Sequence, residues 1–239
     1  MNRNQLVNIF KDTEKYSETL ESNIDTNKHN FSEITKKFVS GRPNITAINS
    51  DSVTASVEYS KLGKTCILNM ASYKHPGGGV TSGAKAQEEC LFRCSNLHTS
   101  MTRDFYPLEF NECLYTTDAV FFKDFHYQYM KPTTIDVVSV AAINLNFQRD
   151  LDDTEYLNVM MNKMRLMLTL PVQHDCENII LGAWGCGVFN NDPNKVSEMF
   201  KNVMIRENFG GFYKNVVFAV INDHNSVDSN YEIFKSTLH

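Results

Sequence analysis

No apolar run of 18 residues occurs in the sequence, so no segment has the length and character of a membrane-spanning helix. The first residues, Met-Asn-Arg-Asn-Gln-Leu-Val, lack the apolar core of a signal peptide. Internal repeats and low-complexity tracts are also missing. We therefore expect a cytoplasmic protein without a membrane anchor. Residues 1–239 are expected to form a single domain, because this length is enough for one substantial core.

The six cysteines include no Cys-x-x-Cys pair and no His/Cys cluster with the spacing of a zinc site. Most of them lie in apolar runs, which is typical of buried free thiols in a reducing compartment. The sequence therefore predicts no metal site and no cofactor.

An excess of positive charge is missing as well. The formal net charge of −5 argues against direct binding of nucleic acid through its phosphates. It still allows a local pocket lined by backbone amides for a diphosphate. A phosphate-loop nucleotide hydrolase is excluded, because neither glycine-rich segment continues into Gly-Lys-Ser/Thr.

Short apolar runs alternate with segments of helical periodicity along most of the chain. Strands are predicted at residues 44–49, 65–70, 115–123, 135–143, 178–184 and 215–221. Helices are predicted at residues 52–61, 84–101, 155–170, 231–238 and from Pro193 to the glycines at 210–211. Because many strands are unbroken apolar runs, we expect a mixed or parallel sheet covered by helices on both faces. In such sheets ligands bind where the loops converge at the strand ends.

The N-terminal region is predicted to be mainly helical. Residues 4–20 form an amphipathic helix, residues 23–30 a polar loop, and residues 32–38 a second short helix. No long linker follows, so residues 1–42 are expected to pack on the core as an extension. The methionine-rich face of residues 155–170 and the single tryptophan, Trp184, are assigned to the core.

The stretch from Asn69 to Met101 carries the chemistry. A strand leads into three glycines, and a helix follows with Gln87, Glu88 and Glu89 in its opening turns. Glycines let a ligand approach the main chain, and carboxylates suit sugar hydroxyls and proton transfer in glycoside cleavage. Neighbouring helix positions point about 100° apart, so one glutamate is expected to bind and the other to catalyse. The alternative is a tight turn with glutamates that complement the helix dipole.

Three glycines, seven further residues and then Gln-Glu-Glu resemble the signature of the microbial-type poly(ADP-ribose) glycohydrolases. A second block, residues 181–193 (Leu-Gly-Ala-Trp-Gly-Cys-Gly-Val-Phe-Asn-Asn-Asp-Pro), resembles the second glycine loop of that family. Weaker similarity covers nearly the whole chain. The resemblance implies an α/β fold, a three-layer α-β-α macrodomain-like arrangement with a mixed central sheet and an N-terminal helical extension.

The resemblance also implies an activity, the exo-acting hydrolysis of ribose–ribose bonds in poly(ADP-ribose) with release of ADP-ribose. Glu89 would be the catalytic acid and would then activate water, while Glu88 and Gln87 orient it and the ribose hydroxyls. The residues near the distal ribose would be Asn69, Gly77, Gly78 and Gly79. The second loop would hold the diphosphate and cover the nucleotide through Gly185, Cys186, Gly187, Val188, Phe189 and Asn190. ADP-ribose, its polymer and ADP-ribosylated proteins are the expected partners of a monomeric protein.

Other interpretations remain open. A non-hydrolytic ADP-ribose reader would keep both glycine loops but has less need of Gln-Glu-Glu. A hydrolase of mono-ADP-ribosylated protein or nucleic acid would use the same site, and a cysteine hydrolase could use Cys90 or Cys186. Asp51 is an adenine-binding candidate by resemblance and a helix N-cap by position. Residues 142–144 read Ala-Ile-Asn where relatives tend to have Ala-Pro-Asn, so this loop is expected to differ in shape or mobility.

Overall fold

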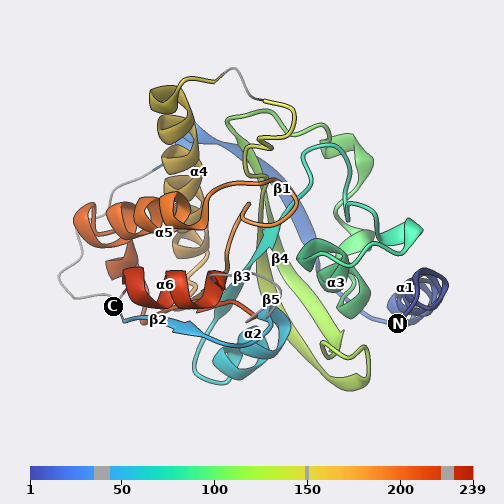
Figure 1. Cartoon of the computed structure of the whole chain (residues 1–239). Helices are drawn as coiled ribbons and strands as arrows, with labels where there is room; N and C mark the ends of the chain where they lie inside the picture. Colours follow the sequence, from blue (N-terminus) through green and yellow to red (C-terminus); the bar gives the residue numbers. More distant parts are fainter. Residues whose placement is uncertain (35–43, 149–150, 222–228, 239) are drawn as a thin grey trace.

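The computed structural model describes residues 1–34, 44–148, 151–221 and 229–238, and these form one mixed seven-stranded sheet (Figure 1). The strand order is β1-β4-β5-β3-β6-β7-β2. Pairing is antiparallel between β1, β4 and β5 and parallel across the rest of the sheet. The strands are β1 (Asp25–Asn30), β2 (Ile45–Ile48), β3 (Thr65–Met70), β4 (Glu112–Lys123), β5 (Tyr129–Val140), β6 (Asn178–Leu181) and β7 (Asn215–Ala219).

Helices cover both faces of this sheet, so the predicted three-layer α/β fold is confirmed (Figure 1). One face carries α1 (Arg3–Ser17), α2 (Ser52–Ser60) and α3 (Gln87–Cys94), and the other carries α4 (Asp153–Gln173), α5 (Pro193–Lys201) and α6 (Asn230–Leu238). The central strand β3 serves both layers, since Cys66 and Leu68 join one core cluster and Ile67 the other. This explains why β3 is an unbroken apolar run. Trp184 is fully buried, as predicted.

The N-terminal prediction is wrong in one respect. Residues 23–30, expected to be a loop, contain the edge strand β1, which pairs along its whole length with β4. The segment Asp-Thr-Asn-Lys-His-Asn has no apolar residue, and only Thr26 is buried. Polar edge strands discourage pairing with other chains. Because such a strand lacks the alternation of apolar residues by which strands are predicted, β1 could not be recognised from the sequence. Of the expected helix 32–38, the described part is a 3₁₀ turn at Phe31–Glu33, and residues 35–38 lie outside the described residues.

Several predicted boundaries also differ from the structure. The helix expected from residue 84 to 101 is α3, which ends at Cys94, because Ser95 turns into extended backbone and pairs with Phe121. The glycines at 210–211 do not end the helix that begins at Pro193. That helix ends at Lys201 and continues as a π-helical turn, Asn202–Arg206. Strands β4 and β5 begin earlier than predicted because they extend together as a long antiparallel pair.

The parallel strands β3, β5, β6 and β7 all end at the same edge of the sheet. The loops that follow them therefore meet there, and they include both glycine loops. Among the described helices, none has both the length and the apolar character needed to cross a bilayer.

Candidate active site

Two carboxylates at the start of α3 hold the first glycine loop. Glu88 accepts backbone hydrogen bonds from Ser72 (2.8 Å) and Gly77 (3.2 Å), and Glu89 accepts one from Gly79 (2.8 Å). The sequence placed the two side chains about 100° apart around the helix, yet both reach the same loop. The amides of this loop are consequently used to orient the two acids and are not free to bind an anion.

Gly78 lies between the two acids and has to be glycine. Its φ angle is +54°, in the left-handed region that residues with a Cβ rarely adopt. A Cβ built on it would lie 2.6 Å from Glu89 Oε1 and 2.9 Å from Glu88 Oε2. The glycine therefore lets both carboxyl groups approach one point of the backbone, which brings them near each other.

Two acceptor atoms in this region are buried and have no hydrogen-bond partner among the described residues: Glu89 Oε2 and Asn69 Oδ1. The amide nitrogen of Asn69 donates to Ser139 Oγ (3.0 Å) and contacts Glu88 Oε1 (3.5 Å). Buried acceptors without a donor are costly in a folded protein. A ligand rich in hydroxyl groups would satisfy both.

Glu88 is a protonated carboxylic acid at neutral pH. Burial raises its pKa to about 8, opposed by the Ser72 amide, while the neighbouring Glu89 raises it further; Asn69 and the Gly77 amide act to lower it. The pair of acids therefore holds a proton at neutral pH.

The raised pKa of Glu88 has a measurable effect on stability. Between pH 4.5 and about 8 the folded protein keeps a proton that the unfolded chain has released, so the free energy of unfolding falls as the pH rises. We expect Glu88→Gln to lower the free energy of unfolding overall, because the NH2 group of glutamine replaces one of the two oxygens that accept hydrogen bonds from the loop. We also expect the variant to lack roughly 2 kcal/mol of the decrease in unfolding free energy that the wild type shows between pH 5.5 and 7.5. Urea unfolding of both proteins at the two pH values measures this. Equal pH dependence in the two proteins would contradict the assignment.

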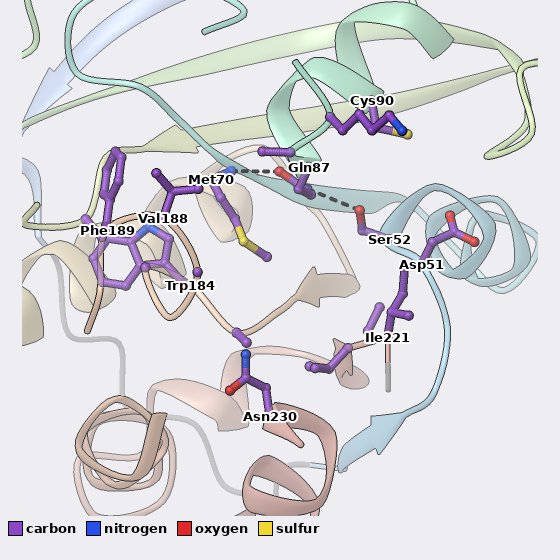
Figure 2. A pocket seen from close by; sticks show the side chains of 18 of the residues that line it. Asp51, Ser52, Met70, Gln87, Cys90, Trp184, Val188, Phe189, Ile221 and Asn230 are labelled. Atoms are coloured by element: carbon purple, nitrogen blue, oxygen red, sulfur yellow. Dashed lines mark hydrogen bonds between the residues drawn. The ribbon is translucent and has the colours of Figure 1, made fainter. Parts of the chain in front are cut away.

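Gln87 connects the start of α3 to the end of β3. Its Oε1 accepts from the Met70 amide (2.9 Å), and its Nε2 donates to the Leu68 carbonyl (2.7 Å) and to Ser52 Oγ (3.1 Å), as Figure 2 shows in part. Both ends of the amide are thus used within the protein. Gln87 fixes the position from which the two acids extend.

The second glycine loop, between β6 and α5, differs from the first in that its amides are not used by side chains of the described residues. Among the described residues, the N–H groups of Gly187, Val188 and Phe189 have no acceptor. A Cβ built on Gly187 would meet no atom within 4 Å, so the fold itself does not require glycine there. Consecutive free amides on open backbone favour an anion.

Asn191 shapes this loop, and the sequence reading did not single it out. Its Nδ2 donates to the carbonyls of Ile143 (2.9 Å) and Gly185 (2.9 Å), and its Oδ1 accepts from Tyr156 (2.8 Å). It therefore joins the loop after β5, the second glycine loop and α4. Nothing in the sequence distinguishes it from Asn190, which borders a different cavity, so the role of Asn191 is visible only in the folded structure.

The loops enclose a cavity of about 400 Å³ (Figure 2). It extends from Asp51, Ile221 and Asn230 at one end to Val188 and Phe189 at the other. The predicted site residues that line it are Gln87, Gly185, Gly187, Val188 and Phe189. Asn69, Glu88, Glu89 and the glycines 77–79 gather just behind its wall, next to the lining residues Met70, Ala71 and Ala86.

Two predicted residues of the second glycine loop do not line this cavity either. Cys186 is half-buried, with its thiol directed at the Trp184 carbonyl (3.6 Å). Asn190 has a left-handed backbone (φ +61°) and borders a separate, smaller cavity. Asp51 both caps α2, through a hydrogen bond from the Thr54 amide (2.8 Å), and lines the main cavity. Its two suggested roles are therefore compatible.

The thiols do not form a nucleophilic site. Burial raises the pKa of Cys186 to about 12, with a further contribution from Asp192, so the thiol is protonated at neutral pH. Cys90 lines the cavity, but its thiol lies 3.9 Å from Cys94 Sγ, and no histidine of the described residues is bonded to either. In the described part of the chain, no cluster of three or more His, Cys, Asp or Glu side chains is arranged to hold a metal ion.

Comparisons with known proteins agree with this geometry. The family model "Microbial-type PARG, catalytic domain" matches residues 3–124. A search of curated protein sequences gives no significant match. The solved structures include a poly(ADP-ribose) glycohydrolase (PARG) from Thermomonospora curvata, with 24% identity and a TM-score of 0.88 over 98% of this chain and 100% of that one.

The same Thermomonospora curvata enzyme bound to the inhibitor ADP-HPD matches at 25% identity and a TM-score of 0.85, over 97% and 98% of the two chains. The PARG of Deinococcus radiodurans in complex with ADP-ribose matches at 24% identity and a TM-score of 0.79, over 90% and 94%. The family match covers both acids, the first glycine loop and more than half of the chain. The chain therefore belongs to the microbial-type PARG family, a family of glycosidases.

Proposed function

We propose that the protein hydrolyses the ribose–ribose O-glycosidic bonds of poly(ADP-ribose) from the end of the polymer and releases ADP-ribose. One observation carries the proposal: Glu89 Oε2 and Asn69 Oδ1 are buried acceptors without partners, beside a cavity bordered by free amides of the second glycine loop. The acceptors suit the hydroxyl groups of a ribose, and the amides suit a diphosphate. ADP-ribose joins these two groups in one molecule.

Glu89 is assigned the proton transfers. Gly79 holds its Oε1, which leaves Oε2 free. The proton that the pair of acids holds at neutral pH is assigned to Oε2 when the substrate is bound, and it passes to the oxygen that departs when the bond to the anomeric carbon breaks. The resulting carboxylate then takes a proton from the water that forms the new bond to that carbon. The acid is regenerated, and the sum is hydrolysis. Glu88, held by the loop, orients Glu89 and the ribose, and Asn69 Oδ1 accepts a hydrogen bond from a ribose hydroxyl.

The remaining cavity residues are assigned to the rest of the nucleotide. Gly187 and Val188 present amides to the diphosphate, and Phe189 packs over the adjoining ribose. At the far end, Asp51 keeps one carboxylate oxygen that does not cap α2 and can accept from the amino group of adenine. ADP-ribosylated proteins are proposed as the carriers of the polymer.

The test is incubation of the purified protein with labelled poly(ADP-ribose) and with an ADP-ribosylated peptide, followed by separation of the products. Free ADP-ribose that appears from the first time point, without intermediate oligomers, is the expected result. Binding without release would identify a reader. Release from the peptide alone would identify a mono-ADP-ribosyl hydrolase, and accumulation of oligomers would contradict exo action.

Gly187→Val tests the diphosphate site separately. Because a Cβ at this position meets no protein atom, the fold is expected to be unaffected. The added side chain stands on the open backbone, so the Kd for ADP-ribose is expected to rise at least about tenfold. Calorimetric titration measures the Kd, and urea unfolding measures the stability.

Gly185→Ala is the comparison variant for stability, because the fold requires glycine at this position. Gly185 has a φ of +77°, and a Cβ there would lie 2.7 Å from the Ala142 Cβ. This variant is expected to lose stability by about 1–2 kcal/mol. Unchanged ADP-ribose affinity in a folded Gly187→Val protein would refute the diphosphate assignment.

A further inference from the structure

The segment from Ser72 to Gly77 surrounds the Glu88 carboxyl group. Ser72 donates to one of its oxygens and Gly77 to the other, and the three residues after Tyr73 form the outside of this turn. A group that leaves the anomeric carbon beside this pair of acids departs next to the turn. The side chains that the turn displays are therefore the first that a leaving group meets.

Lys74 is the exposed cation of this turn. Its Nζ lies 5.3 Å from the ring centroid of Tyr73 and 5.1 Å from that of Phe147, so it stands between two aromatic rings. No acidic side chain of the described residues lies within ion-pair distance of it. Its charge is available to a ligand.

The neighbours of Phe147 join its loop to the second glycine loop, whose residues Val188 and Phe189 line the cavity. The Asn146 side chain donates to the Val188 carbonyl (2.7 Å), and the Leu145 amide donates to the Phe189 carbonyl (3.1 Å). Phe147 is nevertheless 71% exposed, and Val188 is 79% exposed. Among the described large hydrophobic side chains these two are the most exposed, and the hydrogen bond from Asn146 to Val188 joins their loops.

We propose that Tyr73, Lys74 and Phe147 form a subsite for the nucleotide unit that leaves during hydrolysis. An adenine stacks on the exposed ring of Phe147, and the diphosphate of the same unit pairs with Lys74. The inference rests on the proposed glycohydrolase function and specifies its substrate. In poly(ADP-ribose) the leaving ribose carries a base and a diphosphate, whereas in a mono-ADP-ribosylated protein the leaving group is an amino-acid side chain.

The test compares Phe147→Ala and Lys74→Ala with the wild type on three readouts. The first is kcat/KM for poly(ADP-ribose), which is expected to fall about tenfold in each variant. The second is kcat/KM for an ADP-ribosylated peptide, and the third is the Kd for ADP-ribose. Both of these are expected to stay within twofold of the wild type. The Lys74→Ala effect should shrink at high salt, because it removes a screened charge.

The matched controls are Leu62→Ala, an exposed apolar side chain, and Lys131→Ala, an exposed cation, both remote from the strand ends that carry the site. Neither is expected to change the polymer rate. Normal polymer kinetics in Phe147→Ala and Lys74→Ala would overturn the subsite and leave the glycohydrolase function intact. The subsite would also be overturned if the fall in kcat/KM for the polymer were matched by an equal rise in the Kd for ADP-ribose, or by an equal fall in kcat/KM for the peptide. A wild-type protein that releases nothing from the polymer would refute the proposed function and the subsite with it.

Discussion

Glu89→Gln is expected to fold and still to bind ADP-ribose, while its turnover of poly(ADP-ribose) falls roughly 10³-fold. Glutamine has the shape of glutamate, and its Oε1 can still accept the 2.8 Å hydrogen bond from Gly79. The only atom that changes role is Oε2, which has no partner among the described residues. The amide that replaces it cannot deliver a proton to the departing oxygen or take one from water.

Three measurements separate this result from a structural defect. Urea unfolding gives the stability, calorimetric titration gives the Kd for ADP-ribose, and release of ADP-ribose from the polymer gives kcat. The matched control is Glu14→Gln on the exposed face of α1, which is expected to behave as the wild type in all three. Turnover of Glu89→Gln within about tenfold of the wild type would remove Glu89 from the proton transfers.

The sequence predicts those features of the site that depend on residues close together in the chain. Strand β3 has the predicted bounds, Thr65–Met70, and Asp192 caps the helix that begins at Pro193. An apolar run and a cap followed by proline are local patterns that need no tertiary information. Their accuracy placed both glycine loops at the correct strand ends.

The remaining features depend on contacts between distant segments, so the sequence does not reveal them. The helix geometry of Glu88 and Glu89 predicts side chains that diverge. The folded structure shows that both side chains accept hydrogen bonds from the same glycine loop. In the same way, β1 is defined by backbone pairing with β4, and Asn191 by carbonyls from two loops. The two glycine loops also differ in how their amides are used. The amides of the first loop bind the two glutamates, whereas those of Gly187, Val188 and Phe189 in the second loop have no acceptor among the described residues.

The N-terminal helix α1 is bound to the catalytic loop through Arg93, a fully buried residue of α3. Arg93 donates to the Leu6 carbonyl of α1 (3.1 Å) and to the carbonyls of Ala84 (2.7 Å) and Val80 (3.4 Å) after the first glycine loop. Its own carbonyl accepts from Thr13 of α1 (2.6 Å). No carboxylate of the described residues pairs with it, so its charge is compensated by these backbone carbonyls and by the ring of Tyr127, whose centroid lies 5.9 Å from Arg93 Cζ.

Arg93→Leu is therefore expected to lower the free energy of unfolding by about 4 kcal/mol, because three carbonyls lose a charged donor and the shorter side chain leaves a cavity. Without Arg93 the segment after the first glycine loop also loses its link to α3, so kcat is expected to fall in the protein that remains folded. The Kd for ADP-ribose is expected to change little, because it depends on the second loop. Urea unfolding and polymer kinetics below the unfolding transition measure the two effects. Arg103→Leu, at an exposed arginine, is the control. If Arg93→Leu lost stability but kept its kcat, α1 would support the fold without positioning Glu88 and Glu89.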